Sequence, residues 1–313
     1  MPYITQILKR TGVILLLTVL SSCKNPDNFE INNIKEPLIV LNANLIARQS
    51  PKIYVGKVWG ATVPRPSVTF YRNADVELFE NGKSVGKLFL KDTLYQNTNY
   101  IIKPNTKYVI KASVQEIKPV ESEPVLIPAD GMITDIIFLK NSPVNSTNNT
   151  IRNPALITVT FKKDDSIAGY SIQLLNYNKN SERYFSLGEN IDLGTVTFVK
   201  SPCLFDSYTP NVDINGNVGD FIYRGRTAYL RKCIDTESKE VRFVTGSGFP
   251  ENSRVIVILT AISQEGVELS RTTRIVEGFQ AALTEPYPTY SNVKGGIGIV
   301  IGYNVTYKVL NIN

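Results

Sequence analysis

The chain has 313 residues, of which 42% are hydrophobic and 20% charged, a composition typical of globular proteins and a length sufficient for about two domains. Its formal net charge of +6 is too small, and too evenly spread along the sequence, to indicate a nucleic-acid partner. Histidine is absent, which excludes most enzymes that use an imidazole as general base, as partner of a nucleophile, or as zinc ligand.

The first 22 residues have the order of an export signal. The cationic pair Lys9-Arg10 precedes the apolar run Val13–Leu20, which is shorter than the ~20 residues of a membrane-spanning helix. The sequence Leu-Ser-Ser-Cys then ends at Cys23 and has the pattern of a lipobox. We therefore expect residues 1–22 to be removed and Cys23 to become the acylated, palmitate-bearing amino terminus. An ordinary cleaved signal, in which this cysteine is incidental, is the alternative.

Strand signals begin after a polar, turn-prone segment, residues 23–36, which we expect to be a flexible tether. Every second residue of Tyr108–Val114 is apolar, the pattern of a half-buried strand. The pair Asn81-Gly82 predicts a hairpin, because both central positions of a type I′ turn need positive φ. Residues 37–128 are therefore predicted to form an antiparallel β-sandwich.

A second sandwich is predicted over residues 132–313, because Pro128–Gly131 has the composition of a boundary turn. Within it, Ile157–Lys162 shows the cleanest alternation of apolar and polar residues in the chain. The run Arg254–Leu259 is apolar on both faces, as in a central strand that is covered on each side. Helical spacing of apolar residues occurs only over 267–283. The sequence thus predicts an all-β fold with one short helix near the carboxyl terminus.

The three cysteines divide into one and two. If Cys23 carries lipid, Cys203 and Cys233 remain as a pair in an exported, oxidising compartment, and we predict that they form a disulfide. That bond would stabilise the fold by roughly 3–4 kcal/mol in the chain-entropy model, less any strain. Two separate buried thiols are the alternative.

Few residue patterns indicate catalysis or metal binding. Asp164-Asp165 are neighbouring carboxylates, but they lie between strand-like segments, where turns favour aspartate. The oxygen-rich run 213–220 fails the EF-hand pattern, because Val218 and Arg224 occupy its sixth and twelfth positions. We therefore expect no metal, no other cofactor and no intrinsic enzymatic activity. Carboxylate-only glycosidase chemistry is the enzyme alternative, since it needs just two acids held ~5–10 Å apart.

Aromatic residues provide two candidate contact surfaces. Trp59, Phe70 and Tyr71 flank a proline-containing loop, but buried packing is the favoured interpretation, since aromatic side chains dominate sandwich cores. Tyr287 and Tyr290 lie in a segment whose prolines disfavour a central strand. We therefore expect these two tyrosines to be exposed, and they are the candidate interface.

The segment Glu285–Ile299, EPYPTYSNVKGGIGI, resembles the closing motif of a family of Bacteroidota outer-membrane lipoproteins, domain of unknown function 4249. In that family an E-P-x-x-x-Y-S-N-hydrophobic segment leads into a glycine-rich strand. Asn73–Gly82 is similar to the family's early hairpin, and Tyr108–Ala112 is similar to its next strand. Val300-Ile301 departs from the family pattern, which more often has an aromatic residue followed by glycine. The glycines before this pair are expected to let the last strand bend or another backbone approach closely.

The resemblance implies an outer-membrane lipoprotein, often encoded beside TonB-dependent transporters, with a first domain of the transthyretin or immunoglobulin-like type. The family has no agreed activity, so only the lipidated cysteine, Cys23, carries over as a functional residue. We therefore expect an accessory binding lipoprotein that docks on a TonB-dependent outer-membrane transporter, on its periplasmic or its surface side. A structural or adhesive surface lipoprotein without a transporter partner is the alternative, because both need the same anchor and fold.

Overall fold

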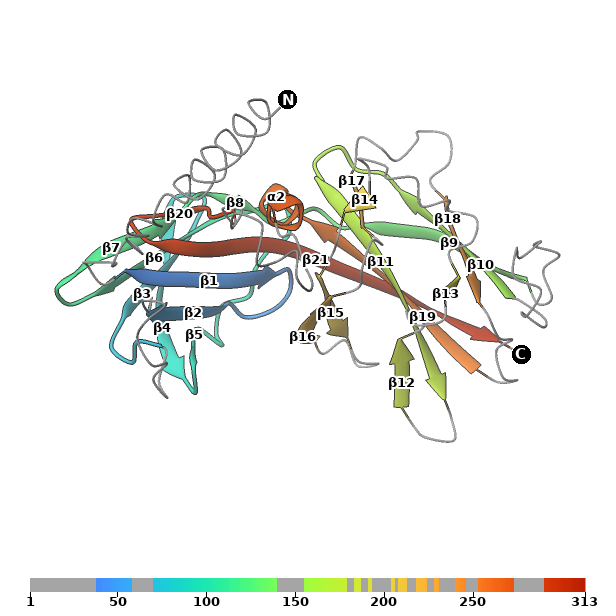
Figure 1. Cartoon of the computed structure of the whole chain (residues 1–313), viewed down its shortest axis with the longest axis horizontal. Coiled ribbons are helices and arrows are strands. Elements are labelled where there is room, and N and C mark those ends of the chain that lie inside the picture. Colours follow the sequence, from blue (N-terminus) through green and yellow to red (C-terminus); the bar gives the residue numbers. More distant parts are fainter. Residues whose placement is uncertain are drawn as a thin grey trace, which may run out of the picture. The chain divides into compact units, whose positions relative to one another are not determined.

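The computed structural model describes the chain in segments (Figure 1). Side chains are described for residues 38–57, 70–139, 156–175, 254–272 and 290–312, and for several strands between 176 and 253 the backbone alone is described. The chain divides into two compact units, and the smaller, residues 1–37 and 58–67, lies outside the described residues. Cys23, Trp59, Cys203, Cys233 and Tyr287 also lie outside them. The lipid, disulfide and Tyr287 predictions therefore stay predictions.

The described elements confirm the predicted all-β class with one short helix. The strands up to residue 126 are β1 (Ile39–Ile46), β2 (Lys52–Lys57), β3 (Asp75–Glu80), β4 (Lys83–Lys91), β5 (Leu94–Gln96), β6 (Lys107–Val114), β7 (Ile117–Ser122) and β8 (Val125–Leu126). The next strands are β9 (Met132–Leu139), β10 (Ala155–Lys162), β11 (Gly169–Asn178), β12 (Arg183–Ser186), β13 (Ile191–Asp192), β14 (Leu204–Phe205), β15 (Tyr208–Val212), β16 (Val218–Tyr223), β17 (Ala228–Leu230), β18 (Glu240–Thr245) and β19 (Ser253–Ile262). The helix α2 (Gln264–Thr272) is followed by β20 (Val293–Lys294) and β21 (Ile297–Ile312).

Most strands belong to one 15-stranded sheet with the order β14-β17-β11-β19-β21-β1-β2-β5-β4-β3-β6-β7-β20, to which β12 adds on β11 and β8 on β6. A four-stranded sheet has the order β13-β18-β10-β9, and β15 pairs with β16. Among the described strands, β1 and β21 form a parallel pair, whereas the other ladders are antiparallel, as the hairpin signals indicated. Asn81 and Gly82 have the positive φ angles, 48° and 81°, that the predicted hairpin turn between β3 and β4 requires.

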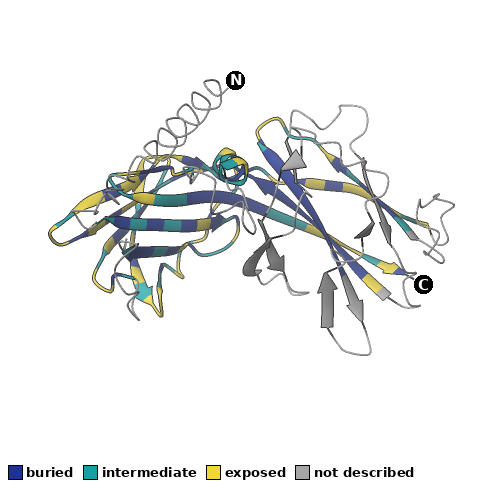
Figure 2. Cartoon of the chain, in the orientation of Figure 1, coloured by how far each residue is buried: buried dark blue, intermediate teal, exposed yellow. Residues whose placement is uncertain are grey.

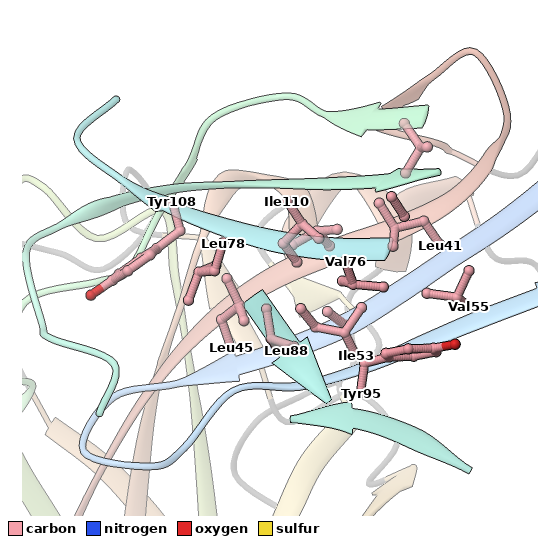
Figure 3. Close-up of a cluster of buried hydrophobic side chains, with 14 of the residues drawn as sticks. Leu41, Leu45, Ile53, Val55, Val76, Leu78, Leu88, Tyr95, Tyr108 and Ile110 are labelled. Carbon is pink, nitrogen blue, oxygen red and sulfur yellow. The ribbon is translucent and has the colours of Figure 1, made fainter. Parts of the chain in front are cut away.

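The first core is enclosed by β1–β8 and contains the residues predicted from alternation (Figure 2). Tyr108, Ile110, Ala112 and Val114 of β6 are all buried, as predicted. Leucine, isoleucine and valine side chains from β1, β2, β3 and β4 point toward them (Figure 3). Each fully buried side chain of this size contributes roughly 1.5–3 kcal/mol, so this cluster is the main stabilising feature of the region.

The second core lies between the four-stranded sheet and the β11–β19–β21 part of the large sheet. Ile157, Val159 and Phe161 of β10 are buried in it, as predicted. The inward residues of β19 are Val255, Val257, Leu259 and Ala261. Ile256 and Ile258 are buried on the opposite face of β19, which confirms the prediction of a central strand covered on each side.

The last strand, β21, differs from the domain organisation that the sequence predicted. Its residues Ile297–Tyr303 pair with Val40–Ile46 of β1, and β20 pairs with β7, although 132–313 were assigned to the second sandwich. Residues Tyr303–Ile312 pair with β19. One strand therefore contributes to the sheet beside both cores. The bounds of the two domains otherwise remain predictions.

The close backbone approach expected at the glycine-rich segment is confirmed at Gly296 and Gly298. A Cβ atom at Gly298 would collide with the carbonyl oxygen of Leu41, and one at Gly296 with that of Ile39. Gly298 also has a φ of +136°, which disfavours any side chain. These two glycines let β21 lie against β1.

The helix α2 begins before the predicted start at residue 267. Ser263 precedes its first turn, and the carbonyl oxygen of Ser263 accepts the first helical hydrogen bond, from the N–H of Val267 at 3.2 Å. Gly266 lies against β21, where a Cβ atom would be 2.9 Å from Cγ2 of Ile301. Residues 273–283 of the predicted helix lie outside the described part of the chain. No helix in that described part has the length and apolar character to cross a membrane.

Candidate functional site

The second half of β21 has a strand neighbour on one edge only. β19 pairs with it from Tyr303 to Ile312, whereas β1, on the other edge, ends its pairing where Ile46 meets Tyr303. Among the described strands, none pairs with that other edge beyond Tyr303. An unpaired strand edge presents backbone N–H and C=O groups that another strand can bind.

The strand β9 is also terminal in its sheet and lies beside this part of β21. Thr306 Oγ1 donates to the carbonyl oxygen of Gly131 at 2.8 Å, and Lys308 Nζ donates to that of Thr134 at 3.0 Å. These two side chains point toward the inner face of the sheet and join its edge to β9. Both sheets around the second core therefore end on the same side.

Apolar side chains are concentrated on these two terminal strands. Of the eight exposed large hydrophobic side chains among the described residues, five are Met132, Ile137 and Leu139 of β9 and Tyr307 and Val309 of β21. Tyr307 and Val309 are 46% and 50% exposed, because they alternate along β21 with residues that face the second core. We call these five residues the open edge. Those of β9 and those of β21 point away from the second core on the outer faces of its two sheets, so they flank the unpaired edge on either side.

Strand edges in soluble proteins usually carry features that prevent uncontrolled pairing. On β9 there is a bulge opposite Thr160 and Phe161, and the exposed Asp135 lies at it. On the second half of β21, Lys308 is the one charged side chain, and its Nζ is bonded to β9. The edge of β21 is therefore the less protected of the two.

A polar junction fixes the point where β1 leaves β21. Arg48, at a φ of 66°, donates through Nη2 to Asp130 at 2.6 and 2.8 Å and through Nη1 to Oδ1 of Asn304 at 3.0 Å. The fully buried Asn304 donates to Asp130 at 2.8 Å and to the carbonyl oxygen of Pro128 at 3.0 Å. The Arg48 hydrogen bond, followed by that of Asn304, holds the pKa of Asp130 below its ordinary value. The chain thus turns away at Arg48 and leaves β21 uncovered from Asn304 onward.

The predicted interface residue Tyr290 is half-buried. Its N–H donates to Thr272 Oγ1 at 3.0 Å, and burial raises the pKa of its phenol. It lies beside α2 rather than on the open edge, so a contact of Tyr290 with a partner stays a prediction. The sequence did not reveal the open edge, because Tyr307 and Val309 alternate with polar residues as in any half-buried strand.

The other sequence candidates have structural roles where they are described. Asp164 Oδ1 accepts the N–H of Ser166 at 2.7 Å and its hydroxyl at 2.6 Å, so the predicted turn role of this residue is confirmed. Tyr71 is buried beneath Lys57, whose Nζ is 4.9 Å from the ring centroid, which fits the favoured packing role. Most of the calcium-like run 213–220 lies outside the described residues.

No sequence pattern indicated the half-buried carboxyl group of Glu265 in the first turn of α2. Burial raises its pKa, a hydrogen bond from Ser263 opposes that rise, and Glu123 raises it further. Its Oε2 is inaccessible and has no hydrogen-bond partner. The helix was predicted to begin at residue 267, so nothing placed Glu265 at a helix end. No group of three or more acidic or cysteine side chains in the described segments is arranged to hold a metal ion.

The fold and the open edge define an all-β protein whose most distinctive described surface is a strand edge with exposed apolar side chains. The chain belongs to the family described as Domain of unknown function (DUF4249), whose model matches residues 24–308. No curated protein matches the sequence. Among solved structures, trypsin activated alpha-2-macroglobulin from Escherichia coli is similar over 75% of this chain and 15% of that chain, with 10% sequence identity and a TM-score of 0.21. This chain therefore spans a small part of that protein's length, and a likeness at this level carries no functional argument.

Proposed function

We propose that the protein is a lipid-anchored accessory binding protein of the outer membrane, which docks on a TonB-dependent transporter through the open edge. The observation that carries this proposal is the unpaired edge of β21 with Tyr307 and Val309 exposed beside it. An extended segment of a partner binds such an edge by main-chain hydrogen bonds, while alternate side chains supply specificity.

The leader and the family support the membrane location. The lipobox ending at Cys23 predicts an acyl anchor, and the family resemblance implies relatives encoded beside such transporters. Anchoring to the same membrane raises the effective concentration of a partner, so a weak interface would be occupied. In the same exported compartment, Cys203 and Cys233 would form a disulfide.

The proposal treats the protein as non-catalytic, because the full sequence contains no histidine and no recognisable pairing of a nucleophile with a base. Its role would be to present or retain the substrate of the transporter. Neither role requires proton transfer or a metal.

The test is cross-linking in the native membrane. Tyr307→p-benzoylphenylalanine places a photoreactive group on the open edge, and Ile101→p-benzoylphenylalanine is the control at a residue of similar exposure far from it in sequence. We expect Tyr307 to give a product that mass spectrometry identifies as a TonB-dependent transporter. No product above the Ile101 control, together with normal nutrient uptake in a deletion strain, would remove the docking proposal and leave a structural or adhesive role.

The anchor is tested separately. Mass spectrometry of the membrane-bound protein should show an amino-terminal Cys23 that carries acyl chains, and Cys23→Ser should release the protein from membranes. A soluble mature protein that starts elsewhere and is unaffected by that substitution would contradict the anchor. For the disulfide, the number of free thiols in the unfolded protein should rise on reduction.

A further inference from the structure

The backbone groups of β21 point alternately to its two edges. On the β19 side, the N–H of Ser263 donates to the carbonyl oxygen of Gly302 at 3.0 Å, and on the β1 side the N–H of Ala47 donates to that of Tyr303 at 2.8 Å. The pairing with β19 then continues to the end of the strand without a register shift. Alternate residues of the open half therefore present their N–H and C=O groups to the unpaired edge, namely Val305, Tyr307, Val309 and Asn311.

An extended polypeptide strand matches this array of donors and acceptors, since its own N–H and C=O groups alternate with the same period. No described residue bonds to the backbone of these four residues on the open side. Directly opposed residues of neighbouring strands share a face of the sheet. A strand added here would thus place one side chain beside Tyr307 and another beside Val309 on the outer face. The residue between those two would lie beside Lys308 on the inner face.

The charged side chains in this part of the sheet are cationic. Strands β11, β19 and β21 contain two charged residues, Arg254 and Lys308, and no carboxylate. Both are exposed, and neither forms an ion pair with a described residue. Asp135, the one carboxylate of β9, precedes Ile136, which packs against the second core, so its side chain points away from Lys308 to the outer face of the small sheet. A carboxylate opposite Lys308 would therefore meet a cation without a counter-charge.

A second copy of the chain is a poor match for the same edge. The antiparallel register that sets Tyr307 of one copy against Val309 of the other also sets Lys308 against Lys308. Like charges directly opposite each other destabilise a strand pair. The register that sets Tyr307 against Tyr307 places Lys308 opposite Thr306 and forms no ion pair. The edge therefore favours a different partner, with an acid where the copy has lysine.

We infer that the unpaired edge of β21 binds one extended strand whose central residues are apolar, acidic and apolar. The two apolar side chains lie opposite Tyr307 and Val309, and the carboxylate lies opposite Lys308. Valine or isoleucine suits the apolar positions, because aromatic–β-branched cross-strand pairs stabilise a sheet, as do pairs of opposite charge. The tripeptide is symmetric, so it fits a parallel and an antiparallel strand equally. The inference rests on the proposed function in taking this edge as the contact, and it adds the chemistry of the bound segment.

The test measures the binding of labelled heptapeptides to the full mature protein, purified from membranes in mild detergent, by fluorescence anisotropy. The probe is Gly-Thr-Val-Glu-Val-Thr-Gly, and the matched control is the same peptide with lysine in place of glutamate. A third peptide carries N-methyl groups on its three central residues, which remove the backbone donors without changing the side chains. The protein variants are Lys308→Glu, Lys308→Gln and, as a control at an exposed lysine of β4, Lys91→Glu.

We expect the glutamate peptide to bind at least about fivefold more tightly than the lysine peptide, and the N-methylated peptide not to bind. Lys308→Glu should reverse that order, Lys308→Gln should remove the preference, and Lys91→Glu should leave it unchanged. Each variant should unfold thermally as the unchanged protein does, because both positions are exposed.

Four peptide results would each overturn the inference: equal affinity for the glutamate and lysine peptides, no binding of either, binding that survives N-methylation, or a preference that is retained in Lys308→Glu. A dimer of the unchanged protein that Val309→Lys dissociates would also overturn it, by assigning the edge to a second copy. The peptides contain no transporter sequence, so these failures leave the docking proposal to its cross-linking test.

Discussion

The two halves of β21 differ in how their edges are paired. In the first half, β1 pairs with one edge. On the other edge, the Asn292 side chain binds the backbone of Val300: its Oδ1 accepts the N–H at 2.9 Å, and its Nδ2 donates to the carbonyl oxygen at 2.9 Å. In the second half, β19 covers one edge and no described strand covers the other. One continuous strand thus has a closed half and an open half, and its neighbours decide which half is which.

The largest effect is expected at the closest backbone contact of the closed half. Gly298→Ala adds a Cβ that collides with the Leu41 carbonyl oxygen at a φ of +136°, so we expect the free energy of unfolding to fall by more than about 3 kcal/mol. Gly86→Ala is the control, because Gly86 also has a positive φ, 110°, but open space around it. It should cost about 1–2 kcal/mol. Equal losses in urea unfolding would mean that β1 and β21 do not approach closely.

A smaller loss is expected when the side chain that pairs with Val300 is removed. Asn292→Ala leaves the N–H and C=O of Val300, both buried, without partners and should lower the free energy of unfolding by about 2–4 kcal/mol. Asn311→Ala, at an exposed position of the open half, should change it by less than about 0.5 kcal/mol. Chemical denaturation of the two variants side by side measures the difference, and a similar loss in both would contradict the comparison.

The junction between the halves should show a pH dependence. Asp130→Asn weakens the pair with Arg48, both about half exposed, so we expect a loss of about 1 kcal/mol at neutral pH. Because pairing lowers the folded pKa of Asp130, its contribution is complete above the ordinary value of 3.8 and declines as pH falls below it toward the folded pKa. Urea unfolding at several pH values should show the two proteins converge below 3.8. A difference that persists in acid would assign the loss to packing.

The smallest effect on stability is expected in the open half. Val309→Lys adds a charge at an exposed position and should change the free energy of unfolding by less than about 0.5 kcal/mol. The same substitution should abolish the cross-link from position 307, because a charged edge strand resists pairing. Ile101→Lys is the control and should leave the cross-link intact. A cross-link of unchanged yield in Val309→Lys would show that the partner does not use this edge.

Local patterns in the sequence predicted most of the local structure. Alternation identified the buried face of β6 and of β10, and Asn81-Gly82 identified the hairpin turn, because these features depend on neighbours within a few residues. The start of α2 was predicted at residue 267, whereas the helix begins at Gln264. The residues before Val267 in the first turn, Gln264, Glu265 and Gly266, include no large apolar side chain, so helical periodicity becomes visible only from residue 267.

The pairing of β1 with β21 and the open edge could not be predicted in this way. Strand alternation shows which face is buried but does not name the strand that pairs with it, and a parallel pair leaves no turn between its members. The exposure of Tyr307 and Val309 depends on where β1 ends, at the positive φ of Arg48. That conformation is uncommon for arginine and gives no sequence signal.

The parallel pair of β1 and β21 has a consequence for the order of folding. Asn42 Oδ1 accepts the N–H of Ile299 at 2.9 Å across a separation of 257 residues, so β1 gains this neighbour only when distant parts of the chain come together. Contacts of such high contact order form slowly. Until they form, one edge of the first sheet has no partner, and unpaired strand edges of incompletely folded chains are prone to aggregation.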